Sequence, residues 1–81
     1  MPAMPLYYFD SRDNGAFIRD DVGLVFSGID TARDQAAIAL AELARDVLPG
    51  SIRRELAIEV RDDGKKPLLR TSLVFEAVRL H

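Results

Sequence analysis

The sequence contains no cysteine and one histidine, His81, at its last position. Without cysteine, disulfides, thiolate metal sites and cysteine nucleophiles are excluded. Zinc prefers nitrogen and sulfur ligands, so a single histidine does not predict a zinc site. Because terminal side chains are usually mobile, we expect no catalytic role for His81. Small secreted domains often rely on disulfides, so the lack of cysteine favours a cytoplasmic location.

Long apolar runs and an excess of positive charge are also missing. No run is long enough to cross a membrane, and Met1–Leu6 lacks the charged and apolar regions of a signal peptide. We expect residues 1–5 to be a loose leader and residues 6–81 to form one domain. The formal net charge is −2, whereas nucleic-acid binders usually have a basic excess. We therefore do not expect nucleic acid as a partner.

Motifs for catalysis or phosphate binding are absent from the sequence. The serines have no companion histidine outside the terminus, and the glycines lack phosphate-loop spacing. The acidic pairs Asp20–Asp21 and Asp62–Asp63 could act as cation ligands or as acids and bases. Both pairs lie next to glycine in expected turns, where aspartate is favoured for structural reasons. We predict a protein that is not an enzyme, with no catalytic, cofactor-binding or metal-binding residues.

The N-terminal third of the sequence reads as a hairpin followed by a short strand. The aromatic run Leu6–Phe9 favours a strand. Asn14–Gly15 between two apolar segments predicts a type I′ turn, which sets Ala16 opposite Asp13. After a second turn, Leu24–Phe26 is expected to form a third strand.

The central segment Thr31–Leu48 predicts a helix, since alanine and leucine are strong helix formers. Asp30 is the expected N-cap, and Pro49–Gly50 should end the helix. The apolar residues of the segment fall on one stripe at helical spacing. They are Ala32, Ala36, Leu40, Leu43 and Val47.

The C-terminal third alternates apolar and polar residues with a period of two. The segment Glu55–Arg61 predicts a half-buried strand with Ala57 on its polar side. A last strand begins at Pro67 and extends as far as Val78. The fold class is α+β: an antiparallel sheet of four to five strands, in the order β-β-(β)-α-β-β, with one helix on one face. The expected core consists of Phe9, Phe26, Leu40, Leu43, Val47, Leu56, Ile58, Val60, Leu73 and Phe75.

The segments Leu6–Asp10, Arg12–Gly15, Asp20–Gly23, Asp30–Arg33 and Glu55–Asp62 together resemble a family of small bacterial proteins. That family is a domain of unknown function, frequent in alphaproteobacteria, and the resemblance covers roughly Pro5 to Leu69. It implies a bacterial, cytoplasmic protein without an assigned activity. Many relatives carry histidine in place of Asp10, which implies no catalytic role for this position. The order of elements is also similar to HicB-type antitoxin domains.

The leading functional hypothesis is a non-enzymatic protein-interaction module that forms a homodimer through its last strand. A small core and an open sheet with unpaired edges favour association. The candidate interface residues are Ile38, Leu68, Val74 and Val78. One alternative is an antitoxin-like or regulatory module that binds a protein or RNA. A second is an enzyme using carboxylates, for which Asp13, Asp20 or Asp62 would line a pocket.

Overall fold

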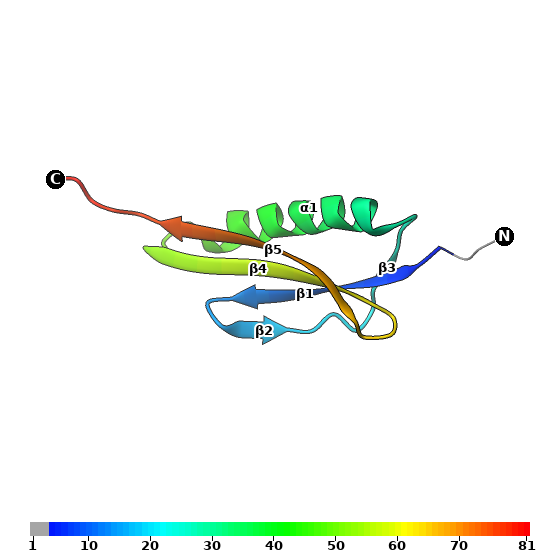
Figure 1. Ribbon diagram of the computed structural model, residues 1–81. Coiled ribbons are helices and arrows are strands. Elements are labelled where there is room, and N and C mark those ends of the chain that lie inside the picture. Colours follow the sequence, from blue (N-terminus) through cyan, green and yellow to red (C-terminus); the bar gives the residue numbers. More distant parts are fainter. Residues whose placement is uncertain (1–3) are drawn as a thin grey trace.

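The computed structural model describes residues 4–81, and it has one helix packed on one face of an antiparallel sheet (Figure 1). The predicted α+β fold is confirmed. Residues 1–3 of the expected leader lie outside the described residues. The elements are β1 (Leu6–Asp13), β2 (Ala16–Ile18), β3 (Leu24–Val25), α1 (Ile29–Val47), β4 (Arg53–Asp62) and β5 (Pro67–Glu76).

The strands form one sheet in the order β2-β1-β4-β5, with β3 paired to the beginning of β1. The first strand joins β4 along most of its length, from Tyr7 opposite Asp62 to Asp13 opposite Leu56. β1 and β4 are therefore the inner strands. On its far side, β5 has no neighbouring strand within residues 4–81.

The first hairpin has the register that the sequence predicted. Asn14 and Gly15 have φ angles of 49° and 91°, and a type I′ turn requires positive values at both positions. Ala16 lies opposite Asp13, and Phe17 opposite Arg12. The turn chemistry alone fixed this part of the sheet.

Helix α1 begins two residues earlier than predicted, and the expected cap is wrong. Gly28 is the N-cap and makes no side-chain hydrogen bond, while Asp30 lies inside the first turn. There its carboxylate still faces the positive end of the helix dipole. The helix ends at Val47, one residue before the predicted end.

The helix lies over β4 and β5, as Figure 1 shows. Phe26 lies between β3 and α1 and packs against the core. Its ring centroid is 5.9 Å from that of Phe9 and 6.5 Å from that of Tyr7. The predicted core residues are all buried or half-buried, but Tyr7 was missed although it is buried. The buried ones are Leu40, Leu56, Ile58 and Val60, and the half-buried ones are Phe9, Phe26, Leu43, Val47, Leu73 and Phe75.

Ala57 differs from the prediction. Its position in the alternating pattern placed it on the polar side of β4, yet it is only 1% exposed. Ala57 sits between Arg12 of β1 and Ser72 of β5 on the sheet face that no helix covers. Because β4 is an inner strand, the longer side chains of both neighbours surround this small residue.

Candidate interaction site

Hydrogen bonds at the start of β4 show which residues of β5 direct their peptide groups toward the free edge of the sheet. Glu55 accepts a backbone hydrogen bond from Asn14 at 2.8 Å, and its own N–H donates to the Asn14 side chain. The peptide groups of Glu55 therefore point toward β1. In an antiparallel sheet these directions alternate, so those of Leu56 point toward β5.

Leu56 lies opposite Leu73, so the odd-numbered residues of β5 bond to β4. A bond from the N–H of Ala77 to the oxygen of Ile52, 2.8 Å long, continues the same pattern. The even-numbered residues must then direct their N–H and C=O groups away from β4. They are Arg70, Ser72, Val74 and Glu76, and they form the edge to which a further strand can bond.

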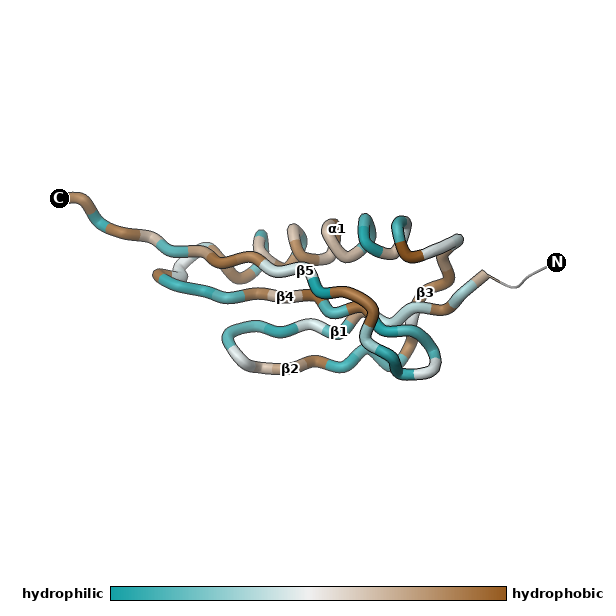
Figure 2. The backbone as a smooth tube through the Cα atoms, in the orientation of Figure 1, coloured by the Kyte–Doolittle hydropathy of each residue, from teal (hydrophilic) through white to brown (hydrophobic). Residues whose placement is uncertain are grey.

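Three of the four predicted interface residues lie along this last segment. Leu68 sits at a β-bulge near the start of β5, Val74 lies on the face without the helix, and Val78 follows the strand. Val74 is 62% exposed and Val78 66% exposed. Figure 2 shows apolar stretches running along β5 into the C-terminal segment. Ile38 is exposed as well, but it lies on α1, apart from the others.

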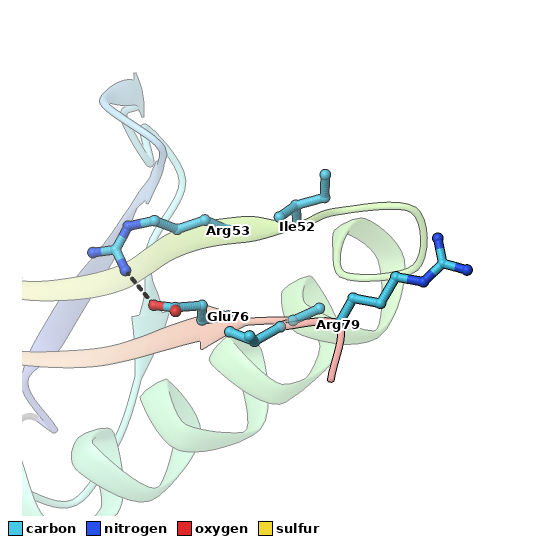
Figure 3. A pocket seen from close by; sticks show the side chains of 6 residues that line it. Ile52, Arg53, Glu76 and Arg79 are labelled. Carbon is cyan, nitrogen blue, oxygen red and sulfur yellow. Dashed lines mark hydrogen bonds and ion pairs between the residues drawn. The ribbon is translucent and has the colours of Figure 1, made fainter. Parts of the chain in front are cut away.

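An apolar hollow of about 840 Å³ lies beside the start of β4 and the end of β5. Figure 3 shows Arg53 reaching toward Glu76 across the two strands, with a distance of 3.2 Å between their charged groups. Ile52, Ala77 and Val78 supply its apolar side chains, and Ile52 is 75% exposed. Ile52 was not predicted as a surface residue, because an isolated isoleucine in a link gives no sign of its exposure.

A second apolar hollow, of about 510 Å³, lies between the end of α1 and β5. Phe75 lines it from the strand, and Ala41, Ala44 and Leu48 line it from the helix. Alanine side chains at the first two positions leave room beside the helix. Apolar surface therefore accompanies β5 on both sides of the sheet.

The family assignment follows from a match to a family model over residues 6–74, which spans β1 to most of β5. The chain belongs to the family described as a domain of unknown function, DUF6894. The predicted resemblance to a family without an assigned activity is thereby confirmed. No curated protein and no solved structure was found to match the chain. The family match includes Leu68 and Val74, so most of the free edge belongs to the family's domain.

Outside the β5 edge, this DUF6894 domain has a polar network on the face without the helix. Asp10 is buried, and Arg61 donates to it from Nε at 2.9 Å. The second carboxylate oxygen of Asp10 accepts the backbone N–H of Asp20 at 2.9 Å. Arg61 also donates to the backbone oxygen of Asp20 and stacks over the ring of Tyr8. The network holds the loop after β2 against the sheet.

The Asp20 side chain accepts hydrogen bonds from backbone N–H groups of the turn that follows it and of β1. Burial raises the pKa of this carboxyl, but hydrogen bonds from the backbone N–H groups of Phe9, Val22 and Gly23 lower it, as does the charge of Arg61. The net result is a pKa below its ordinary value. Both oxygens are occupied by these donors, which gives the carboxylate a structural task.

The other two acidic candidates are also bound within the fold. Asp13 forms a two-pronged ion pair with Arg54 at 2.6 and 2.8 Å, and this hydrogen bonding lowers the pKa of Asp13. Asp62 accepts the N–H of Lys66 in the turn between β4 and β5. The three carboxylates are not brought together. Of them, Asp20 lines a hollow, of about 140 Å³, which is well below the roughly 300 Å³ of small ligand sites.

Within residues 4–81, no group of three or more acidic or histidine side chains is arranged to hold a metal ion. No helix in the same part of the chain is both long and apolar enough to cross a membrane.

Proposed function

We propose that this DUF6894 domain is a non-enzymatic protein-interaction module that forms a homodimer through the edge of β5. The observation that carries the proposal is the free edge, where the peptide groups of alternate residues point away from the sheet. Such groups bond readily to another strand. Monomeric proteins protect an edge with lysine, proline or bulges. Here those features, Lys65, Lys66, Pro67 and a bulge, are confined to the beginning of β5.

Apolar surface beside the edge adds to the case for association. Val74 projects on one face of the sheet, and the hollow at Phe75 lies on the other. A strand added to β5 would bring side chains over both, and their burial would contribute about 25 cal/mol per Å² of apolar surface. A domain of this size has a small core, so such burial matters for its stability.

The non-enzymatic part of the proposal rests on how the carboxylates are used. Asp10, Asp13 and Asp20 each accept hydrogen bonds from an arginine or from backbone N–H groups. A general base needs a free lone pair directed at a substrate. The hollow at Ile52 and Val78 exposes mostly apolar surface beside the Arg53–Glu76 pair, which suits a protein surface better than a reaction centre.

Light scattering at micromolar concentration tests the proposal directly. We expect a mass of about twice the 9.0 kDa of one chain. Ser72→Pro removes an N–H group from the free edge and should give a monomer, since proline is tolerated at an edge position that bonds to no strand. Glu42→Arg, a change on the exposed surface of α1 and outside the candidate interface residues, is the control and should remain dimeric.

Should Ser72→Pro disturb folding, judged by circular dichroism, Val74→Lys offers a second way to block the edge. Lysine on an edge strand opposes pairing with another strand. A wild-type chain that stays monomeric at these concentrations would overturn the proposal. So would a dimer that both edge variants leave intact.

The alternative is an antitoxin-like or regulatory module whose partner is another protein or an RNA. A foreign strand could use the same edge of β5. The arginines on the helix-free face are largely paired, Arg12 with Glu59 and Arg61 with Asp10, which disfavours binding to phosphates. A salt-sensitive shift in RNA electrophoresis would favour this alternative.

For either function we infer a bacterial protein, as the family resemblance implies. We also infer a cytoplasmic location, in keeping with the lack of cysteine.

A further inference from the structure

The charges of β5 are Arg70 and Glu76, and both lie among the residues whose peptide groups point outward. Arg70 forms no ion pair within residues 4–81. Glu59 lies opposite it on β4 but pairs with Arg12 instead. Glu76 pairs with Arg53 at 3.2 Å, but both side chains are more than half exposed. Each charge therefore remains available to a neighbouring strand.

Two-fold symmetry limits how two copies of β5 can pair. If residue i of one copy lies opposite residue j of the other, then residue j of the first copy lies opposite residue i of the second. Hydrogen-bonded pairs can form only between outward-pointing residues. An antiparallel pairing must therefore set Arg70, Ser72, Val74 and Glu76 opposite one another.

One of the permitted registers brings opposite charges together at both ends. It places Arg70 opposite the partner's Glu76, and Glu76 opposite the partner's Arg70. A shift by one pair in either direction puts apolar or uncharged residues opposite these charges. An axis at Arg70 or at Glu76 would set like charges against each other, which destabilises cross-strand pairs.

We infer that two copies associate in this register, with the two-fold axis beside Leu73. The inference rests on the homodimer proposed above. Ser72 then lies opposite the partner's Val74, and on the helix side Thr71 lies opposite the partner's Phe75. The two Leu73 side chains meet at the axis, and both helices cover the same face of one continuous sheet.

A cysteine scan tests the register, because the natural chain contains no cysteine. The peptide groups of Leu73 point toward β4, so the two copies of this residue form a non-hydrogen-bonded pair with Cα atoms about 4.5 Å apart. This separation suits a disulfide. Leu73→Cys should form a covalent dimer on mild oxidation, at least about tenfold faster than Ser72→Cys or Val74→Cys, because a single register has one residue at its axis.

Charge reversal supplies a second measurement. Arg70→Glu replaces two cross-strand attractions with two repulsions and should raise the dimer dissociation constant about tenfold. Adding Glu76→Arg should restore the affinity to within about threefold, because the opposite charges again face each other. Glu42→Arg, on α1, is the matched control and should leave the constant unchanged.

The outcomes separate the register from the dimer itself. Rapid cross-linking through Ser72→Cys or Val74→Cys, with little through Leu73→Cys, would overturn the register and leave the homodimer standing. A dimer dissociation constant that Arg70→Glu leaves unchanged would also overturn the register. A wild-type monomer, with no cross-linking at the three positions, would overturn both proposals.

Discussion

At the scale of single residues, Asp10 and Arg61 are charged side chains that the fold buries on the sheet face without a helix. Their side chains retain 8% and 12% of their exposed surface, and 2.9 Å separates their charged groups. Removing two charges from water costs several kcal/mol each, which the ion pair and its added hydrogen bonds must offset. The loop carrying Asp20 supplies such bonds to both residues. The pair and the loop therefore depend on each other.

Asp10→Ala should reduce the free energy of unfolding by about 3–5 kcal/mol, because it leaves the Arg61 charge buried without its partner. Urea denaturation would measure the loss. The control is Asp34→Ala, which breaks an exposed contact with Arg33 of 3.6 Å and should change stability by less than about 0.5 kcal/mol. A loss under about 1 kcal/mol for Asp10→Ala would show that water reaches the pair.

Gly23 and Gly15 offer a comparison between strain alone and strain with a steric clash. Both have positive φ, at +76° and +91°, so alanine at either position costs about 1–2 kcal/mol. A Cβ atom at Gly23 would also lie 3.0 Å from the Tyr7 carbonyl oxygen, whereas Gly15 has open space around it. In thermal unfolding, Gly23→Ala should be less stable than Gly15→Ala by about 1 kcal/mol or more. Equal losses would contradict a close contact at Gly23.

The acid sensitivity of the fold should depend on Asp20. Its folded-state pKa lies below the ordinary value, so the ionised carboxylate stabilises the fold at neutral pH. This contribution is complete above the unfolded pKa of about 3.9 and is lost as the pH falls through the folded value. Unfolding free energies measured below about pH 4 should fall steeply for the natural chain and less steeply for Asp20→Asn. Parallel curves would contradict this assignment.

At the scale of elements, α1 is anchored by one stripe of side chains facing β4 and β5. Leu40 is buried in that stripe, whereas Ile38 is exposed on the opposite side of the helix. Leu40→Ala should cost about 2–5 kcal/mol, through lost transfer energy and the cavity left behind. Ile38→Ala should change the stability by less than about 0.5 kcal/mol. Chemical denaturation of the two variants would check which side of the helix faces the sheet.

Signals confined to a few neighbouring residues were sufficient to predict the elements. Asn14–Gly15 fixed the first hairpin, and the alternation in Glu55–Arg61 identified β4. The predicted N-cap was wrong because Gly28, which has no side chain to accept a hydrogen bond, occupies the N-cap position. The prediction favoured Asp30 because aspartate is among the commonest N-cap residues. These elements depend mostly on local chemistry, and their boundaries less so.

The polar network could not be predicted, since it requires β1 to lie beside β4. Arg61 is 51 residues from Asp10 in the sequence, and it also bonds to Asp20. No pattern in the sequence states which strands are neighbours. Asp20 was interpreted as a turn residue, and its hydrogen bonds to Val22 and Gly23 confirm that part. Its link to Asp10 was invisible without the strand order.

At the scale of the whole molecule, association and folding should be coupled. If two copies pair through β5, each gains stability from its partner, and the melting temperature rises with protein concentration. Calorimetry over a hundredfold range of concentration, roughly 1 to 100 μM, would measure the shift. Ser72→Pro should melt at a temperature independent of concentration. A natural chain with the same independence would contradict a dimer that dissociates on unfolding.

The inner position of β4 also has a kinetic consequence. Its pairing with β5 spans a short turn, whereas its pairing with β1 must enclose β2, β3 and the whole of α1. Closing the longer segment costs more entropy, so the hairpin of β4 and β5 should form early and the N-terminal hairpin should dock late. During synthesis, β1 leaves the ribosome long before the strand that it needs. Until β4 follows, Tyr7 and Phe9 have no completed core to enter, so apolar side chains that the fold covers remain in contact with water.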